Sequence, residues 1–246
     1  VGSEMCIRDR YENPGQEVFD RLDRELAVIE KLGFPSYFLV VWDFTKEAIR
    51  LGIPNTARGS GVGSLVCYAL YISHVCPLRY GLLFERFLDE NRLEAPDIDT
   101  DLDKERRHEV LEYIKFKYGY DNVAQIGTYG TMAARSAIRD CVRALGVPLP
   151  RVNQIITMVP DELGIKLEDA LNKSPELRAE YDNNQDVKEM YDYAVKLEGT
   201  PRNRGTHAAA VVIADKPLTD HVPLCRVKGK EELTTQWAMG DVEDAG

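Results

Sequence analysis

The sequence predicts a mixed α/β fold that is interrupted by an all-helical insertion at about residues 129–204. Three observations lead to this prediction. Aspartates recur at every second position of residues 97–101, which is the period of a strand. The apolar run Ala208–Ala214 is typical of a buried strand. Between them, residues 149–198 have the charged, polar composition of several short helices.

The first half of the chain is predicted to be mostly helical. Leu22, Leu26 and Ile29 give residues 20–31 an apolar face, and Gly33 and Pro35 end that helix. Residues 37–52 fit a buried helix or strand, and their length favours a helix. The elements predicted after it are a loop over 54–63, helices over 64–72 and 82–88, a strand over 98–102 and a helix over 104–118.

The second half alternates strands and helices. We predict a strand over 123–127, a helix over 132–145 that Gly146 and Pro148 end, and a basic loop over 199–205 before the apolar run. Residues 1–10 are expected to be a non-native or disordered leader outside the fold. They lack an initiator Met and a hydrophobic block, and they contain four charged side chains.

Composition excludes several classes of protein. No stretch approaches the roughly 20 apolar residues of a membrane span, so we expect no membrane segment. Five scattered cysteines without a C-x-x-C pair indicate reduced thiols and a cytoplasmic protein rather than a disulfide framework or a zinc knuckle. The net charge of −10 argues only weakly against nucleic-acid binding, because the positions of the charges matter more than their sum.

A glycine-rich stretch runs from Arg58 to Ser64 and is followed by an apolar helix. Glycines let backbone N–H groups approach an anion, and a helix N-terminus adds unpaired donors. Arg58 would add a charge-assisted contact. A flexible linker with Ser64 as the helix N-cap is the alternative.

The aspartates of residues 97–101 are the second feature. On a strand, Asp97 and Asp99 face the same side, where a cation would relieve their repulsion. Carboxylate oxygens suit Mg²⁺, which takes one or two carboxylates plus phosphate oxygens. Asp101, or Asp103, fits the duller role of capping the following helix. A solvated acidic turn is the alternative for the whole cluster.

Arginines are the third feature. Arg135, Arg139 and Arg143 recur every four residues and form a stripe on one helix face, while Ala134, Ile138, Cys141 and Leu145 form a separate apolar face. The stripe predicts contact with DNA phosphates, and a solvated face is the alternative. An anion-binding loop, paired carboxylates and a basic helix together suit nucleotidyl transfer by two metal ions.

Five stretches, in this order, resemble bacterial DNA polymerase III alpha subunits, the C-family of DNA polymerases. They are RGSGVGSLVCYAL, PLRYGLLFERFL, PDIDTDLDKERRHEVLEYI, QIGTYGTMAARSAIRD and EGTPRNRGTHAAAVVI. The resemblance covers nearly all of residues 20–246. It implies a nucleotidyltransferase-type palm, like that of DNA polymerase beta, with an inserted helical thumb. The implied division is palm over 11–128 and 205–246 and thumb over 129–204.

The resemblance also implies roles for individual residues. Asp97 and Asp99 match two of the family's three metal-binding aspartates. Gly59 and Ser60 match its triphosphate-binding glycine-serine motif. Arg58 and Arg86 match basic residues of the same pocket. The third aspartate is expected beyond Gly246, so the chain alone is expected not to polymerise. Residues 55–57 read Asn-Thr-Ala where the family usually has a Gly-Pro-Gly-like sequence.

The implied partners are Mg²⁺, deoxynucleoside triphosphates and primer-template DNA. The sliding clamp and the other replicase subunits would bind through parts outside this chain. Two other classes stay open. A two-metal nuclease or phosphodiesterase could use the same aspartates, and a non-catalytic DNA-binding module could use the arginine stripe.

Overall fold

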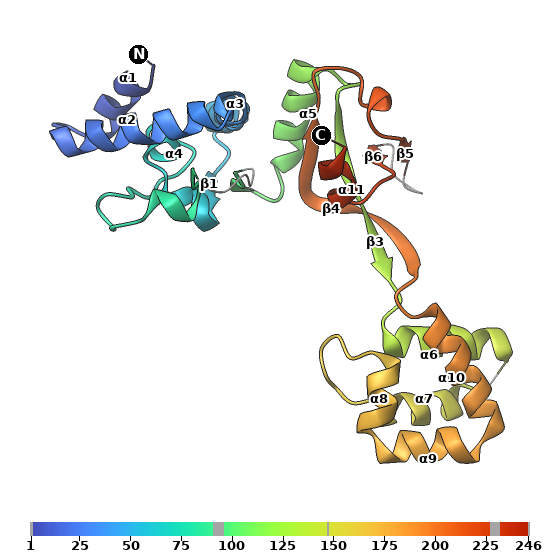
Figure 1. The fold of residues 1–246 in the computed structure, drawn as a ribbon. Coiled ribbons are helices and arrows are strands. Elements are labelled where there is room, and N and C mark those ends of the chain that lie inside the picture. The colour runs from blue at the N-terminus through green and yellow to red at the C-terminus, as the bar shows by residue number, and fades with distance from the viewer. Residues whose placement is uncertain (1, 91–95, 147, 227–231, 246) are drawn as a thin grey trace. The chain divides into compact units, whose positions relative to one another are not determined.

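The computed structural model of the chain describes residues 2–90, 96–146, 148–226 and 232–245 (Figure 1). The chain divides into two compact units, residues 1–120 and 121–246. Each unit combines helices with a small sheet, so the predicted mixed α/β class is confirmed. None of the described helices combines the length and the apolar character needed to cross a lipid bilayer.

The first unit is mainly helical in its described part. Its helices are α1 (Gly2–Arg10), α2 (Gln16–Lys31), α3 (Pro35–Arg50), α4 (Leu65–Ala69) and α5 (Arg107–Tyr118), with 3-10 turns η1 (Gly59–Gly63) and η2 (Phe84–Arg86). The strands β1 (Asn55–Arg58) and β2 (Asp99–Leu102) pair antiparallel. The predicted loop over 54–63 is therefore half strand and half 3-10 turn, because β1 is held by a partner about 40 residues away.

The local patterns explain most of these helices. Leu22 and Ile29 of α2 are buried, as the apolar face predicts. Gly33 follows α2 with a φ of 80°, a left-handed conformation that glycine adopts without strain. Pro35 then begins α3 at a position where its missing N–H is not needed.

Residues 2–10 are not excluded from the fold, which corrects the expectation of a disordered leader. They form α1, and Ile7 is fully buried in the core of the first unit. Arg10 donates hydrogen bonds to the carbonyl oxygens of Tyr68 (2.7 Å) and Ser73 (2.6 Å), and its guanidinium lies over the Tyr68 and Tyr71 rings. These partners are about 60 residues away, so no local pattern revealed them.

The second unit contains a sheet and a helical bundle. Its strands β3 (Val123–Thr131), β4 (Pro201–Ile213), β5 (Leu224–Arg226) and β6 (Leu233–Thr235) lie in the order β4-β3-β6-β5. The helices are α6 (Ala134–Leu145), α7 (Leu149–Met158), α8 (Leu167–Lys173), α9 (Pro175–Asn183), α10 (Gln185–Leu197) and α11 (Met239–Asp244), with a 3-10 turn η3 (Leu218–Asp220). Figure 1 shows α6–α10 at one end of the long β3–β4 ribbon, and β5, β6 and α11 at the other.

Two predictions about β4 are corrected. The basic loop expected at 199–205 belongs largely to β4, which begins at Pro201 and pairs with the end of β3. The run Ala208–Ala214 is only partly buried, and Ala208 and Ala209 are exposed. The reason is that β4 lies at the edge of the described sheet rather than inside it.

The helices α6–α10 have a core of their own. Each of them buries at least one large apolar side chain in a single cluster, as with Ile138, Ile155, Leu167, Leu177 and Met190. The Tyr191 hydroxyl in this core donates a 2.7 Å hydrogen bond to the Leu167 carbonyl oxygen. These helices lie between residues 134 and 197, whereas the two ends of the predicted insertion, 129–131 and 201–204, belong to β3 and β4.

Candidate metal and nucleotide site

The pairing of β1 with β2 brings the glycine-rich stretch to the aspartates. Arg58, the last residue of β1, lies directly opposite Asp99, the first residue of β2. An Arg58 guanidinium nitrogen is 3.6 Å from Asp99 Oδ2, and Arg58 Nε is 3.3 Å from Asp101 Oδ1. The structure thus brings together Arg58, Asp99 and Asp101 on an exposed face of the first unit.

The aspartates alternate with less exposed neighbours. Asp97 precedes β2 and is exposed, Ile98 is buried, and Asp99 and Asp101 are exposed again. This alternation of exposure agrees with the period of a strand, although β2 itself begins only at Asp99. Asp103 accepts hydrogen bonds from the Glu105 and Arg106 amides, so it caps the turn at 104–106. The helix α5 begins only at Arg107 and has no side-chain cap, which corrects the expectation that Asp101 or Asp103 caps it.

The glycines allow a close approach between the two segments. Gly59 has a φ of 68°, and a Cβ placed there would lie 3.9 Å from Asp99 Oδ2. A Cβ on Gly61 would contact Ile98, and one on Gly63 would lie 2.8 Å from the Leu83 carbonyl oxygen. The chain therefore turns sharply after Arg58 and then packs against the residue between the two aspartates.

The N-terminus of α4 is not open to an anion, which corrects part of the expected phosphate cradle. Ser64 is the N-cap, as predicted, and accepts a hydrogen bond from the Cys67 amide. However, the Ser64 hydroxyl (2.9 Å) and the Val66 amide (3.1 Å) both donate to the Glu25 carboxylate. The anion that satisfies this helix start is thus a side chain of the protein itself. Of the residues in the expected phosphate cradle, only 58–60 remain available to contact a phosphate.

Arg86 lies in η2, which contacts η1, the glycine turn of Gly59–Gly63. Arg21 donates to the Gly63 carbonyl oxygen (2.9 Å) and to the Leu82 carbonyl oxygen (3.3 Å), and this links the two segments. Arg86 itself is exposed, and no ion pair joins it to another described residue. Ser60 is exposed as well.

Two residues that support this site carry no motif that identifies them in the sequence. Glu25 is completely buried, and Arg21 donates to it at 2.6 Å. The sequence signal was a carboxylate on the apolar face of α2, three residues after Leu22 and one before Leu26. Tyr37 in α3 is the other, because its hydroxyl oxygen accepts a 3.1 Å hydrogen bond from the amide of Ile98. Burial raises the pKa of Tyr37, and the charges of Asp97 and Asp99 raise it further, against the opposite effect of the Ile98 hydrogen bond.

The carboxylates fit a hard divalent cation. The Asp99 and Asp101 side chains are 50% and 61% exposed, so water and a substrate could complete a coordination sphere. A guanidinium already lies beside them, which shows that this face attracts positive charge. Within the described ranges no group of three or more His, Cys, Asp or Glu could hold a metal by itself, so two carboxylates need further oxygens from elsewhere.

The arginine stripe lies on α6 of the second unit, and two of its members have acidic partners. Arg135 donates to Asp161 Oδ1 (3.0 Å) and to the Val159 carbonyl oxygen (3.0 Å), and Arg143 pairs with Asp140. Two of the three arginines are therefore already paired within the second unit. Arg139 is exposed and has no ion pair with another residue of the described ranges.

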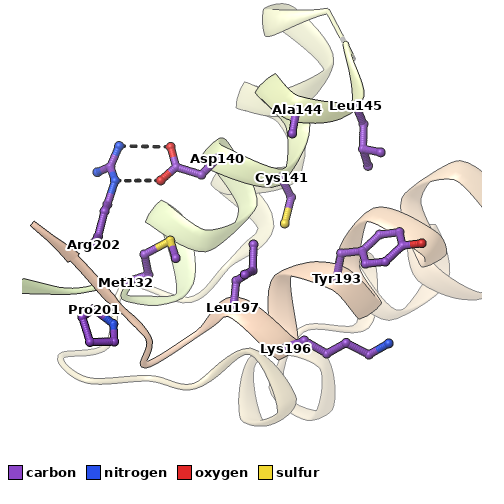
Figure 2. Close-up of a pocket in the computed structure, with 10 residues that line it drawn as sticks. All are labelled: Met132, Asp140, Cys141, Ala144, Leu145, Tyr193, Lys196, Leu197, Pro201 and Arg202. Atoms are coloured by element: carbon purple, nitrogen blue, oxygen red, sulfur yellow. Dashed lines mark hydrogen bonds and ion pairs between the residues drawn. The ribbon is translucent and has the colours of Figure 1, made fainter.

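A groove of about 690 Å³ opens on the helical bundle between α6, α10 and the start of β4 (Figure 2). Apolar side chains, Leu145 and Leu197 among them, line it, and Arg202 pairs with Asp140 at its edge with Nε–Oδ2 at 2.7 Å. Leu145 belongs to the predicted apolar face of α6, but 48% of it is exposed, because it lies in the last turn at the groove.

Comparison with known proteins places the chain in a family. The model of the bacterial DNA polymerase III alpha NTPase domain matches residues 3–246. The chain belongs to that family. It is 44% identical to the DNA polymerase III subunit alpha of Bacillus subtilis over 249 aligned residues, covering 99% of this chain and 22% of the relative. The corresponding Escherichia coli K12 subunit is 46% identical over 232 residues, covering 94% of this chain and 20% of the relative.

The chain spans about a fifth of the length of these DNA polymerase III alpha relatives. The matched region includes both units, from α1 to α11. The family match therefore covers the aspartates and the glycine turn of the first unit, and also the arginine stripe of the second.

The histidines of the first unit bear on the rival nuclease class. His74 Nε2 lies 3.0 Å from the Asn55 carbonyl oxygen, and His108 Nδ1 lies 2.9 Å from the Glu105 carbonyl oxygen. Asn55 pairs with Leu102 at the far end of the β1–β2 ladder from Asp99. Neither contact supplies the histidine ligand or water-activating base that a two-metal nuclease usually adds beside its carboxylates.

Proposed function

We propose that this chain is the part of a replicative DNA polymerase that binds the incoming nucleotide and holds two of the catalytic carboxylates. The observation that supports this most is the meeting of Arg58, Gly59 and Asp99 at the end of the β1–β2 ladder. The family membership supports the same reaction, template-directed addition of deoxynucleotides to a primer 3′-hydroxyl.

In this proposal Asp97 and Asp99 hold Mg²⁺. The bound ion supplies charge neutralisation on the reacting phosphate and activation of the attacking hydroxyl. The chain supplies an exposed carboxylate face on a short strand whose backbone is tied to β1 and to Tyr37. A fixed backbone matters because electrostatic stabilisation of a transition state depends on groups that need no rearrangement.

Arg58, Gly59, Ser60 and Arg86 bind the triphosphate in this proposal. The two arginines are exposed and can turn toward an anionic ligand. Gly59 has no side chain to stand between the turn and Asp99, so a phosphate could approach both. Arg58 would bind it by charge-assisted hydrogen bonds, which are stronger than neutral ones.

The proposed architecture is a nucleotidyltransferase-type palm of residues 11–128 and 205–246 with a helical thumb of 129–204. The independent core of α6–α10 supports a separate helical module at the thumb positions. Arg135, Arg139 and Arg143 would contact primer-template DNA from α6. The sliding clamp and the other replicase subunits would bind outside this chain.

Primer extension by the full-length polypeptide that contains this chain tests the proposal. Asp99→Ala should abolish Mg²⁺-dependent nucleotide addition while primer-template binding stays within about twofold, because most duplex affinity comes from phosphate contacts elsewhere. Asp103→Ala is the matched control, since that carboxylate caps a helical turn.

The same assay separates the other classes. Degradation of the labelled primer-template without extension would indicate a nuclease. Binding without either reaction in the wild-type protein would indicate a DNA-binding module. Wild-type rates of extension in the Asp99→Ala variant would contradict the carboxylate assignment.

A further inference from the structure

Ile98 is the residue between the two proposed metal-binding aspartates, and both its side chain and its amide are held. Its side chain is buried beneath the glycine turn, where a Cβ on Gly61 would lie 3.7 Å from Ile98 Cγ1. Its amide precedes β2, whose first ladder pair is Asp99 with Arg58. That N–H donates to the Tyr37 hydroxyl oxygen at 3.1 Å. One residue thus sets the backbone from which both carboxylates project.

Tyr37 is well placed to act as that anchor. It lies in the first turn of α3, and its ring packs at the edge of the core with its centroid 6.1 Å from that of Phe38. A side chain fixed by packing holds its polar tip in one place, which is how residues outside a site orient those within it. After it accepts from Ile98, the phenol still has an O–H hydrogen to donate.

We propose that Tyr37 is a positioning residue for Asp97 and Asp99, which acts by holding the Ile98 amide between them. This inference rests on the proposed function and deepens it. Without the hydroxyl, the segment Asp97–Asp99 keeps its buried Ile98 side chain but loses the bond that fixes its rotation about the strand axis. The affinity of the two carboxylates for a shared cation would then be lower.

The raised pKa of Tyr37 is consistent with this role. Burial and the charges of Asp97 and Asp99 keep the phenol protonated through the neutral range. A neutral hydroxyl beside two carboxylates adds no further repulsion to a cation site.

The test uses Tyr37→Phe in the 246-residue chain, with Mn²⁺ binding followed by electron paramagnetic resonance. The variant keeps the ring and removes only the hydroxyl, so we expect Mn²⁺ affinity to fall by about fivefold, the effect of one hydrogen bond. Exchange of the Ile98 amide with deuterium, measured by NMR without metal, should become at least about fivefold faster. Tyr113→Phe is the matched control, because it removes a hydroxyl that donates to Asp43 (3.1 Å) elsewhere in the same unit.

The outcomes separate this inference from the proposed function. If the double substitution Asp97→Asn, Asp99→Asn abolishes Mn²⁺ binding and Tyr37→Phe leaves it unchanged, the positioning role alone is overturned. An unchanged Ile98 exchange rate overturns it as well. If the wild-type chain binds no Mn²⁺, or binding survives the double substitution, the proposed metal site falls, and the positioning role falls with it. The inference is supported if Tyr37→Phe and Tyr113→Phe lower the thermal unfolding midpoint equally and only Tyr37→Phe reduces the affinity for Mn²⁺.

Discussion

Arg58 and Asp99 lie directly opposite each other across the β1–β2 ladder, with a guanidinium nitrogen 3.6 Å from Asp99 Oδ2. The same guanidinium reaches Asp101 Oδ1 at 3.3 Å through its Nε. One arginine therefore pairs with Asp99 of the proposed metal site and with Asp101, its neighbour on β2. All three side chains are at least half exposed, so the pairing is weak and exchangeable.

Arg58→Gln should make Mn²⁺ bind more tightly to the chain, by about two- to fivefold. The reason is that the guanidinium competes with the ion for Asp99, and an exposed pair is worth at most about 1 kcal/mol. The same substitution should weaken triphosphate binding, since it removes a charge-assisted donor. Mn²⁺ titration followed by electron paramagnetic resonance, and calorimetry with a deoxynucleoside triphosphate, measure the two effects.

Arg24→Gln is the matched control for Arg58, because Arg24 forms a similarly exposed ion pair with Glu85 at 3.1 Å in the same unit. It should change neither affinity. Weaker Mn²⁺ binding in Arg58→Gln would mean that Arg58 orients the aspartates rather than competing for them.

Glu25→Gln should lower the free energy of unfolding of the first unit by about 3 kcal/mol. Glu25 is fully buried and accepts from Arg21, Ser64 and Val66. Glutamine keeps the size but leaves the largely buried Arg21 without a charge partner, and breaking a buried pair costs about 3–5 kcal/mol. The glutamine oxygen can still accept from Ser64 and Val66, but its amide nitrogen then faces Arg21 Nε and cannot accept from it. Urea unfolding followed by Trp42 fluorescence in a Trp237→Phe background measures the change.

Glu30→Gln on the same helix is the control for Glu25, since Glu30 is exposed. Its expected effect is within about 0.5 kcal/mol. If Glu25→Gln lowers the free energy of unfolding by less than about 1 kcal/mol, water solvates Arg21 in place of the missing carboxylate. The glycine turn would then not depend on this carboxylate.

The arginines of α6 should differ in their effects. Arg139→Ala should reduce the slope of log binding constant against log salt by about one for duplex DNA, without a change in thermal stability. Arg135→Ala should also lower stability, because Arg135 donates to the Val159 carbonyl oxygen and to Asp161. Replacing Arg135, Arg139 and Arg143 together should reduce the slope by up to about three.

Arg178→Ala serves as the control for the stripe, because Arg178 pairs with Asp182 on α9 of the same bundle and is about equally exposed. An unchanged salt slope in the triple variant would identify the stripe as a solvated face.

The sequence predicted what depends on local pattern. The aspartate alternation needs only the two-residue period of a strand, and the ends of α2 and α6 need only glycines at positive φ, at Gly33 and Gly146. The apolar face of α2 was also readable, because its period follows the helix. The division between helical and mixed parts came from the same kind of information.

The parts that were missed depend on partners far away in the chain. The strand Asn55–Arg58 exists because β2 pairs with it, and β4 begins at Pro201 because the end of β3 lies beside it. Glu25 meets the glycine-rich stretch 39 residues later, and Tyr37 meets Ile98 61 residues later. Asp161 reaches Arg135 across 26 residues. Period and composition cannot reveal contacts of this kind.

Cys67 should resist alkylation in the folded chain and should make stability fall as the pH rises. The Cys67 side chain lies in α4 and is fully buried, and burial raises its pKa to about 12. In the unfolded chain a cysteine has a pKa of about 8.5. Above that value the unfolded state loses a proton that the folded state keeps, so stability falls between about pH 8.5 and 12, by at most about 1.4 kcal/mol per pH unit.

Two measurements check this prediction for Cys67. Iodoacetamide at pH 8 should modify the partly exposed Cys6, Cys76 and Cys225 well before Cys67. Urea unfolding at pH 8.5 and 10 should show a smaller loss of stability in Cys67→Ala than in the wild-type chain, whereas Cys225→Ala should keep the wild-type loss. Rapid modification of Cys67 in the folded chain would mean that α4 opens readily. The glycine turn that precedes it would then be a poor platform for the proposed nucleotide site.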